Sequence, residues 1–510
     1  MRLSNSVRPA ILALALCASA PLAFAASDRG KEYLRTGQVE KAKTYYDEWL
    51  AKDPASPDAQ AGSGAVLIAY GDFDAAMTRL ESGLETNPEH YDLNLNLSLA
   101  YYYKAKELAD LGRSAVSVGS LFNDAVRKAE VAAKIDPQRF EAFQTLGVIQ
   151  QFQSEFESSV ASLRKATELA PEDSYTWYQL GESLRFSEDY EEAVKAYDKA
   201  AKTFKDAPGF YEAVRLRGLC YQWLEDEDAA AKAYVEAISI SPDSAAAWDD
   251  LWNLYAAQKK FDEAEVVYLD LLKKQPRNAY VHLVLGSVYA YNVDFDEALA
   301  AFKKAIDLAK TTEIKAAAYY QVGITYKELD ETEKAVEALQ MALKVSPEFE
   351  DPIAVLSGIA REKSEAGEFA AAAKVNEFLA EFKQTDGFIW SDLGLVYRDW
   401  GKYKEALAAY EKAAKFEPYD AQILNDYAVV LDYHFDRVEE AFPLYVQALE
   451  IENNIDAMQN LTRIYLKRGK FKDAVEMATK ALEYDSSRPV IRDMLEEAKR
   501  RMGQTSTSGK

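Results

Sequence analysis

The chain has 510 residues, of which 49% are hydrophobic and 28% charged, a composition typical of a folded globular protein rather than a disordered one. Its 84 acidic and 60 basic residues give a formal net charge of −24, which repels phosphate backbones and argues against nucleic acid as a partner. Only three histidines are present, far apart, and the sequence has no zinc-protease motif, phosphate loop or serine-nucleophile motif, so we expect no enzyme, no cofactor and no metal site.

Residues 1–25 are predicted to be a cleaved signal peptide. Arg2 and Arg8 form a positive region, an apolar run covers 11–16, and 23–25 read Ala-Phe-Ala, which is a typical cleavage site. The apolar run is too short to span a bilayer, and no later segment has about 20 apolar residues. We therefore expect a periplasmic or secreted protein without a transmembrane anchor.

The two cysteines do not suggest chemistry. Cys17 lies in the predicted signal peptide, but Leu16 before it differs from the small residue that lipoprotein signals place there, so lipidation is disfavoured. After cleavage Cys220 is the remaining cysteine and cannot form an internal disulfide. Its apolar neighbours predict a buried, inert thiol.

Residues 26–487 repeat one pattern about thirteen times. Each copy has two amphipathic helical segments, with small and aromatic residues at matching places, and most copies end at a proline. The terminating prolines are Pro54, Pro88, Pro137, Pro171, Pro242, Pro276, Pro347 and Pro418. One helical pair cannot bury both of its apolar faces, so the copies should stack on one another.

The third copy is longer than the others. Pro88 and Pro137 are 49 residues apart, against a usual period of about 34. The surplus lies near 108–119. It is either a longer helix with an exposed loop or an insertion that docks a partner, and the sequence does not decide between them.

The clearest copy covers 387–418. In its first segment Trp390, Leu393, Gly394 and Tyr397 fall at i, i+3, i+4 and i+7, and so share one face of a helix. Its other matching residues are Gly401, Tyr403, Ala406, Tyr410, Ala413 and Pro418. The pattern resembles the tetratricopeptide repeat (TPR) family. The resemblance implies an all-α fold, a right-handed superhelix (α-solenoid) of about thirteen helical hairpins.

The C-terminal end is expected to close the array. Residues 488–503 predict an amphipathic capping helix and 504–510 a disordered tail. The inward face of this helix should carry Val490, Ile491, Met494, Leu495 and Ala498. From Ile455 to Lys510, 12 basic residues face 8 acidic ones. This basic end is either a solvated cap, which we favour, or a surface for an acidic partner, anionic lipid or another copy.

The resemblance further implies binding along a concave surface lined by the first helix of each hairpin. The candidate lining is Tyr102, Tyr103, Phe152, Tyr175, Tyr178, Arg185, Phe186, Arg215, Trp223, Asp249, Asp250, Asn253, Tyr291 and Tyr320. Amphipathic rings suit a groove for a peptide or a partner helix. The alternative is that some of these rings pack between hairpins.

One place in the first helices repeatedly holds a side chain with an acceptor oxygen. These residues are Asp28, Asn96, Gln179, Asp250, Gln321, Asp392, Asp426 and Asn460. They resemble the asparagine rows with which some family members hold a peptide backbone. Residues that are kept only because they serve the fold explain the pattern equally well. Ser391, Leu395, Asn425 and Val429 replace the basic pattern that clamps a terminal carboxylate, so recognition of an acidic C-terminus is disfavoured.

The prediction is a non-catalytic, exported scaffold that binds protein or peptide partners in envelope, secretion or polysaccharide-export assembly. The alternatives are a solenoid that binds glycan or peptidoglycan, and a structural subunit that polymerises through its acidic body and basic end. The partner and the oligomeric state are left open.

Overall fold

The computed structural model describes residues 29–113, 115–204 and 207–507, and in this part of the chain every regular element is an α-helix. The predicted signal peptide, Cys17 and Asp28 lie outside the described residues. The helices are α2 (Arg29–Arg35), α3 (Val39–Lys52), α4 (Pro57–Tyr70), α5 (Phe73–Thr86), α6 (Tyr91–Asp110), α7 (Ala115–Ile135), α8 (Phe140–Phe152), α9 (Phe156–Leu169), α10 (Ser174–Phe186), α11 (Tyr190–Thr203), α12 (Ala207–Trp223), α13 (Glu227–Ile240), α14 (Ala245–Gln258), α15 (Phe261–Lys274), α16 (Ala279–Tyr291), α17 (Phe295–Leu308), α18 (Thr312–Glu328), α19 (Thr332–Val345), α20 (Asp351–Glu365), α21 (Phe369–Phe382), α22 (Gly387–Asp399), α23 (Tyr403–Phe416), α24 (Ala421–Phe435), α25 (Val438–Ile451), α26 (Ile455–Lys467), α27 (Phe471–Tyr484) and α28 (Pro489–Thr507).

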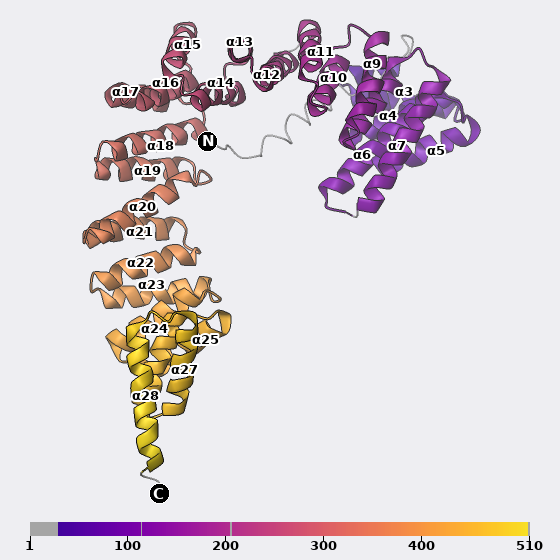
Figure 1. Cartoon of the computed structure of the whole chain (residues 1–510). Helices are drawn as coiled ribbons and strands as arrows, with labels where there is room; N and C mark the ends of the chain where they lie inside the picture. The colour runs from indigo at the N-terminus through magenta and orange to yellow at the C-terminus, as the bar shows by residue number, and fades with distance from the viewer. Residues whose placement is uncertain (1–28, 114, 205–206, 508–510) are drawn as a thin grey trace. The chain divides into compact units, whose positions relative to one another are not determined.

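Successive helices pair into hairpins, from α2 with α3 to α26 with α27, so the described residues form thirteen hairpins followed by α28. This confirms the predicted all-α solenoid. The chain divides into two compact units, residues 29–270 and residues 271–507, with the division inside α15. Within the second unit the pairs α18 with α19, α20 with α21 and α22 with α23 lie in successive layers (Figure 1).

In many hairpins the two helices pack closely because the first carries a glycine where the second presents a large side chain. A Cβ placed on Gly394 would lie 3.0 Å from the Tyr410 ring, and one on Gly286 would lie 2.5 Å from the Phe302 ring. Tyr410 and Phe302 are fully buried. The close approach of the helices at Gly394 is therefore explained by an aromatic ring that fills the space above a missing side chain.

The turn between the two helices of a hairpin needs one residue with positive φ. Six hairpins place glycine there, including Gly401 at φ 78°. Seven place another residue there instead, and these are Ser154, Glu188, Glu225, Lys259, Val293, Asp330 and Asp436. Because a left-handed conformation crowds the Cβ atom of an L-residue, these turns are strained, most of all at the β-branched Val293.

In three hairpins a tryptophan hydrogen bond also joins the first helix to the segment before it. The Trp177 indole donates to the Pro171 carbonyl oxygen at 2.8 Å, Trp248 donates to the carbonyl of Pro242 at 3.0 Å, and Trp390 to that of Gln384 at 2.9 Å. In each case the acceptor lies six residues earlier in the chain. The repeated tryptophan thus fixes the connection that leads into its own helix.

A buried charge network joins the first hairpin to the third and fourth. Lys31 Nζ lies 2.8 Å from Asp92 Oδ2, and Arg139 Nη1 lies 3.0 Å from Asp92 Oδ1. The Arg139 guanidinium also covers the Tyr91 ring at 3.7 Å. Because Lys31 and Asp92 are both buried, this contact between distant hairpins is shielded from solvent.

The surplus residues of the third hairpin lengthen its helices. Helix α6 has 20 residues and α7 has 21, against 13 or 14 in α8 to α11. Leu111 and Val116, which flank the turn between them, are 64% and 82% exposed. Whether this extension docks a partner stays a prediction.

Helix α28 packs on the last hairpin. Ile491, Leu495 and Ala498 are buried, as predicted for an inward face, and Ile491 and Leu495 contact buried residues of α26 and α27. Val490, predicted to face inward, is 49% exposed because it begins the helix at the edge of that contact. The helix ends at Thr507, beyond the expected residue 503, and residues 508–510 lie outside the described part.

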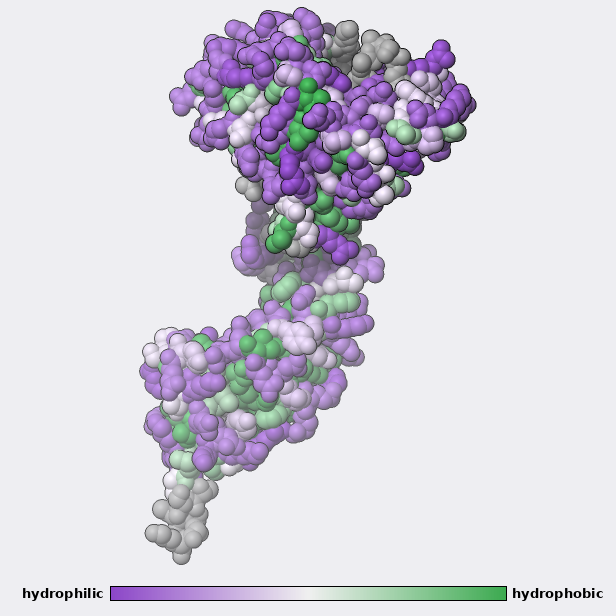
Figure 2. Space-filling view, turned by 90° about the vertical axis from the view of Figure 1, so that its right-hand side faces the viewer, coloured by the Kyte–Doolittle hydropathy of each residue, from purple (hydrophilic) through white to green (hydrophobic). Residues whose placement is uncertain are grey.

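The visible face of the molecule is mostly hydrophilic, with small and separate hydrophobic patches (Figure 2). In the part of the chain that the structure describes, no helix combines the length and the apolar character needed to cross a bilayer.

Candidate functional site

The predicted groove residues fall into both units. The first unit holds those from Tyr102 to Asn253, and the second holds Tyr291 and Tyr320. Tyr291 is 61% exposed, whereas Tyr320 packs edge-on against Phe349 with ring centroids 5.5 Å apart. Asn253 is exposed on α14. The structure therefore brings together a subset of the predicted lining rather than one continuous row.

Four of the predicted residues form what we call the tyrosine cluster, namely Tyr102, Tyr103, Tyr175 and Tyr178. The rings of Tyr102 and Tyr103 lie 5.1 Å apart on α6. Burial raises the pKa of both, and Tyr175 on α10 adds to the rise, so Tyr175 of the fifth hairpin lies near these two tyrosines of the third. Burial and Glu182 raise the pKa of Tyr178, and Tyr175, its neighbour one turn along α10, adds to the rise.

The tyrosine cluster is poorly solvated. Burial raises the pKa of Tyr102, Tyr103 and Tyr178 above the usual range, and burial together with Asp173 raises that of Tyr175 to about 12. The phenols are therefore uncharged at neutral pH. Among the described residues, no side chain or backbone group accepts from or donates to the hydroxyls of Tyr102, Tyr103 and Tyr178, so these remain able to bind a ligand.

Tyr102 also has a structural role. It is 9% exposed, and its ring contacts Phe122 at 6.1 Å and Phe152 at 6.0 Å in the core of the third and fourth hairpins. Tyr178 contacts Tyr197 at 6.0 Å and Phe204 at 6.3 Å. Tyr102 thus packs between hairpins, as in the predicted alternative, whereas these contacts of Tyr178 lie within its own hairpin.

Phe152, Phe186 and Trp223 end the first helices of three consecutive hairpins and are 45%, 47% and 44% exposed. Phe186 stacks on Phe156 at 5.1 Å, and Trp223 lies 4.9 Å from Tyr190, so each ring also joins neighbouring hairpins. Each therefore combines a packing role with an exposed edge.

The predicted cations of the first unit are engaged in ion pairs. Arg185 binds Glu182 through Nε at 3.0 Å, and its guanidinium lies 4.0 Å from the Phe186 ring and 5.9 Å from the Trp223 ring. Arg215 joins Glu212 at 2.8 Å to Asp250 at 2.7 Å, a contact between the sixth and seventh hairpins. These arginines position the neighbouring first helices.

Asp249 differs from Asp250. Burial and the Asp250 carboxylate raise the pKa of Asp249 to about 6, and no cation in the described residues pairs with it. Burial also raises the pKa of Asp250, and Arg215 opposes that rise. The charge of the Asp250 carboxylate is thus balanced by Arg215, whereas the neighbouring Asp249 carboxylate has no such cation.

The predicted row of acceptor side chains does not form one ladder. Asn96 is buried and donates to the Ala61 carbonyl oxygen at 3.0 Å, Gln179 hydrogen-bonds to Tyr175, and Asp250 binds Arg215. These three residues hold the fold together. The row has a different role near the C-terminus, where Asp426 and Asn460 line one pocket.

We call this cavity of about 510 Å³ the C-terminal pocket; it lies among α22, α24 and α26, which are the first helices of the last three hairpins. Its lining is Arg398, Asp399, Asn425, Asp426, Val429, Tyr433, His434, Asp456, Gln459 and Asn460. The sequence marked Asp426 and Asn460 as a row and Asn425 and Val429 as departures from a carboxylate clamp. It did not indicate that the four share a cavity, because that requires the register of α24 against α26.

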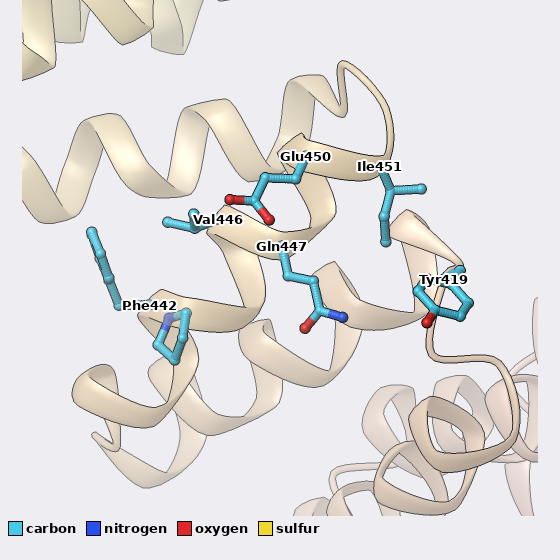
Figure 3. A pocket seen from close by; sticks show the side chains of 7 residues that line it. Tyr419, Phe442, Val446, Gln447, Glu450 and Ile451 are labelled. Carbon is cyan, nitrogen blue, oxygen red and sulfur yellow. The ribbon is translucent and has the colours of Figure 1, made fainter.

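A second depression, of about 650 Å³, lies beside α25 (Figure 3). Phe442 lies at one end of it, and Tyr419 and Ile451 at the other (Figure 3). Tyr419 is 82% exposed and Ile451 37%. Its lining is mostly apolar, and no pattern in the sequence indicated it.

The histidines and the thiol have structural surroundings. His90 lies 3.2 Å from Asp58, His282 contacts the Pro276 carbonyl oxygen at 3.1 Å, and His434 stacks on Tyr403 at 3.6 Å. Cys220 is fully buried, which raises its thiol pKa to about 12. Over the residues for which positions are described, no group of three His, Cys, Asp or Glu is arranged to hold a metal ion.

Comparisons with known proteins agree with the repeated helical hairpins. Models of the tetratricopeptide repeat match residues 33–94, 145–201, 178–245, 224–288, 277–348, 388–420 and 457–490. The human Superkiller complex protein 3 is 25% identical over 354 residues, which are 67% of this chain but 20% of that relative's own length. A TPR repeat-containing protein of Methanocaldococcus jannaschii is 22% identical over 87% of this chain and 70% of its own length.

Among solved structures, that of MamA is 25% identical, covers 36% of this chain and 96% of its own, and has a TM-score of 0.30. The matches to models of one repeat are spread over more than half of the sequence. The chain belongs to the tetratricopeptide repeat family.

Proposed function

We propose that the chain is an exported, non-catalytic scaffold that binds a protein or peptide partner at the tyrosine cluster of its first unit. The observation that carries the proposal is that tyrosines of α6 and α10 lie near one another and that three of them, Tyr102, Tyr103 and Tyr178, have hydroxyls without a partner among the described residues. Their pKa values keep the phenols neutral, so they offer apolar rings and hydrogen-bonding groups together. Aromatic residues of this kind dominate the binding energy of many protein interfaces.

The chemistry of the surroundings favours a protein ligand over a reacting small molecule. The neighbouring ionisable groups, Arg185 with Glu182 and Arg215 with Asp250, are matched in pairs and serve packing. One relative is named as a component of a complex, which agrees with a scaffold role. The part of the proposal that concerns export rests on residues 1–25 of the sequence, which carry the predicted signal peptide.

The test is a pull-down from envelope extracts with the processed chain and a Tyr175→Ala, Tyr178→Ala double variant. Wild type should enrich a defined protein at least about tenfold over the double variant, since truncating two central aromatic anchors removes several kcal/mol of binding. Tyr291→Ala, an exposed tyrosine in the other unit, is the matched control and should bind as wild type does. Equal enrichment by wild type and the double variant, both with native helix content, would contradict the proposal.

The export proposal has its own measurement. Mass spectrometry of the chain recovered from the periplasm or medium should give a mature N-terminus at Ala26. Recovery of the full-length chain in the cytosol alone would contradict export and leave the partner-binding proposal standing.

A further inference from the structure

The depression beside α25 lies on the second helix of its hairpin, whereas the tyrosine cluster and the C-terminal pocket lie on first helices. We call it the α25 depression; it has a volume of about 650 Å³ and is lined by Tyr419, Phe442, Pro443, Val446, Gln447, Glu450 and Ile451 (Figure 3). Of these seven residues, Glu450 alone is charged, and five of the others have apolar side chains or rings. The α25 depression therefore suits an apolar surface of a partner rather than a charged small molecule.

The apolar surface of α25 is not continued on the neighbouring second helices. The ninth residue of α25 is Val446, whereas the ninth residue of α23 is the exposed Glu411 and that of α27 is the exposed Thr479. The sixth residue of α25 is the exposed Pro443, and the sixth residue of α27 is the exposed Glu476. A bounded apolar patch on an otherwise polar surface indicates an interaction site.

Tyr419 projects from the same surface. It lies in the connection between α23 and α24 and is 82% exposed. The Gln447 carboxamide of α25 donates through Nε2 to the carbonyl oxygen of Pro418 at 3.1 Å, so the residue before Tyr419 is tied to α25. The ring is thus exposed while its backbone is held in place, which lowers the entropy cost of inserting this ring into a partner.

The surface has the arrangement that two copies of the chain need in order to cover each other. Phe442, Val446 and Glu450 follow one another at i, i+4 and i+8, so they share one face of α25 with Val446 at its centre. Tyr419 and Ile451 lie at one end of the α25 depression and Phe442 at the other (Figure 3). When two antiparallel α25 helices are related by a two-fold axis beside Val446, the Tyr419 end of each copy meets the Phe442 end of the other.

The charges near the α25 depression agree with the same pairing. The Arg468 guanidinium lies 4.6 Å from the centre of the Phe442 ring, and Phe442 is about two turns along α25 from Glu450. Arg468 also binds Glu439 at 2.5 Å, and the Glu439 side chain is largely exposed. The antiparallel pairing brings the Glu450 carboxylate of each copy towards the Arg468 guanidinium of the other. The one carboxylate in the depression therefore meets a cation.

We propose that the α25 depression is the interface of a symmetric dimer of this chain. The Tyr419 ring of each copy fills the α25 depression of the other beside Phe442 and Pro443, and the two Val446 side chains meet near the two-fold axis. Such a contact closes on itself, in contrast to a head-to-tail polymer. The proposal does not depend on the tyrosine cluster, because no residue of that cluster lines the α25 depression.

The experiment measures the mass of the processed chain by sedimentation equilibrium at concentrations from about 1 to 100 μM. We expect twice the monomer mass at the highest concentration and dissociation on dilution. Raising the salt from about 50 to 500 mM should strengthen the dimer, because salt screens the repulsion between two acidic copies, each with a formal charge of −24 over its full sequence. Dissociation by salt would instead show an assembly held by opposite charges and would contradict the proposal.

Variants assign the dimer to the α25 depression. Val446→Glu places a charge at the centre of the contact and should weaken dimerisation at least about tenfold. Tyr419→Ala, at a side chain whose exposure means that its loss does not threaten folding, should also weaken it, whereas Tyr419→Phe keeps the ring and should not. Thr479→Glu introduces the same charge at the equivalent place on α27 and is the matched control, which should dimerise as wild type does.

A cysteine substitution tests the position of the two-fold axis. Oxidation of Val446→Cys should link two copies through a disulfide, because equivalent side chains of the two copies lie within bonding reach only near the axis. Cys220, the other cysteine of the processed chain, is fully buried and does not compete. Thr479→Cys should stay unlinked under the same conditions.

Two results would overturn the proposal. One is a wild-type chain that stays monomeric at about 100 μM, which would leave the α25 depression to a different protein. The other is a dimer that persists unchanged in natively folded Val446→Glu and Tyr419→Ala variants.

Discussion

At the scale of single residues, the carboxylates of the first helices differ in how well their charge is matched. Asp250 has Arg215 at 2.7 Å, whereas the pKa of its neighbour Asp249 is raised to about 6 by burial and by the Asp250 charge. An unfolded aspartate titrates near pH 3.9. The folded chain therefore binds an extra proton at Asp249 between about pH 4 and 6.

The stability of the first unit should therefore depend on pH. Because the pKa of Asp249 is raised in the folded state, the free energy of unfolding falls as the pH rises from about 4 to 6. The full loss is reached above about pH 6. Asp249→Asn should therefore raise the stability of the first unit by about 1 to 2 kcal/mol at pH 7 and leave it unchanged near pH 4. Urea unfolding followed by circular dichroism at both pH values measures this. A gain of the same size at both would contradict the assignment.

At the scale of the element, the turns within hairpins vary in sequence while they keep one conformation. Val293 has φ 67° and is 66% exposed, so neither its backbone nor its side chain is stabilised by burial. Gly401 has φ 78° in the equivalent turn of another hairpin. The same backbone geometry is thus strained in one hairpin and relaxed in the other.

Val293→Gly should stabilise the second unit by about 1 kcal/mol, because glycine adopts this conformation without crowding a Cβ atom. The reverse change, Gly401→Val, should destabilise it by a similar or larger amount. Thermal unfolding of both variants measures the difference. Destabilisation by Val293→Gly would show that the Val293 side chain makes a contact worth more than the strain.

The helical pairs could be predicted because their spacing is a local property of the sequence. Trp390, Gly394 and Tyr410 repeat at distances fixed by the helix, so sequence was enough to place them. The stacking of Phe186 on Phe156 and the use of Asn96 to bond Ala61 could not be predicted. Those contacts depend on the register between hairpins, which no short-range pattern encodes.

At the scale of the whole molecule, each unit has its own set of contacts. Hairpins in an array contact mainly their neighbours, so stability is local and a defect spreads over a limited distance. The tyrosine cluster lies in the first unit, and the C-terminal pocket lies in the second. Sequence placed Tyr291 and Tyr320 with the tyrosines of the first unit because the repeat pattern continues without a break across 270 and 271.

Tyr410→Ala should destabilise the second unit by about 3 to 5 kcal/mol, since it opens a cavity beside Gly394 at a fully buried ring. Hydrogen exchange should accelerate in α22 to α25 and stay unchanged in α4 to α9. Tyr410→Phe is the matched control. It keeps the ring and removes a buried hydroxyl that has no hydrogen-bond partner, so it should be neutral or slightly stabilising. Uniform acceleration across both units would contradict their independence.

The turns with positive φ have one more consequence. Each of the seven that lack glycine presents its side chain to solvent, and four of those side chains, at Glu188, Glu225, Asp330 and Asp436, are acidic. The helices on either side set the backbone of these turns. A single substitution can therefore change the charge that a turn presents to solvent in either unit. The interior packing that defines the repeat would be untouched, so surface identity and architecture can evolve separately.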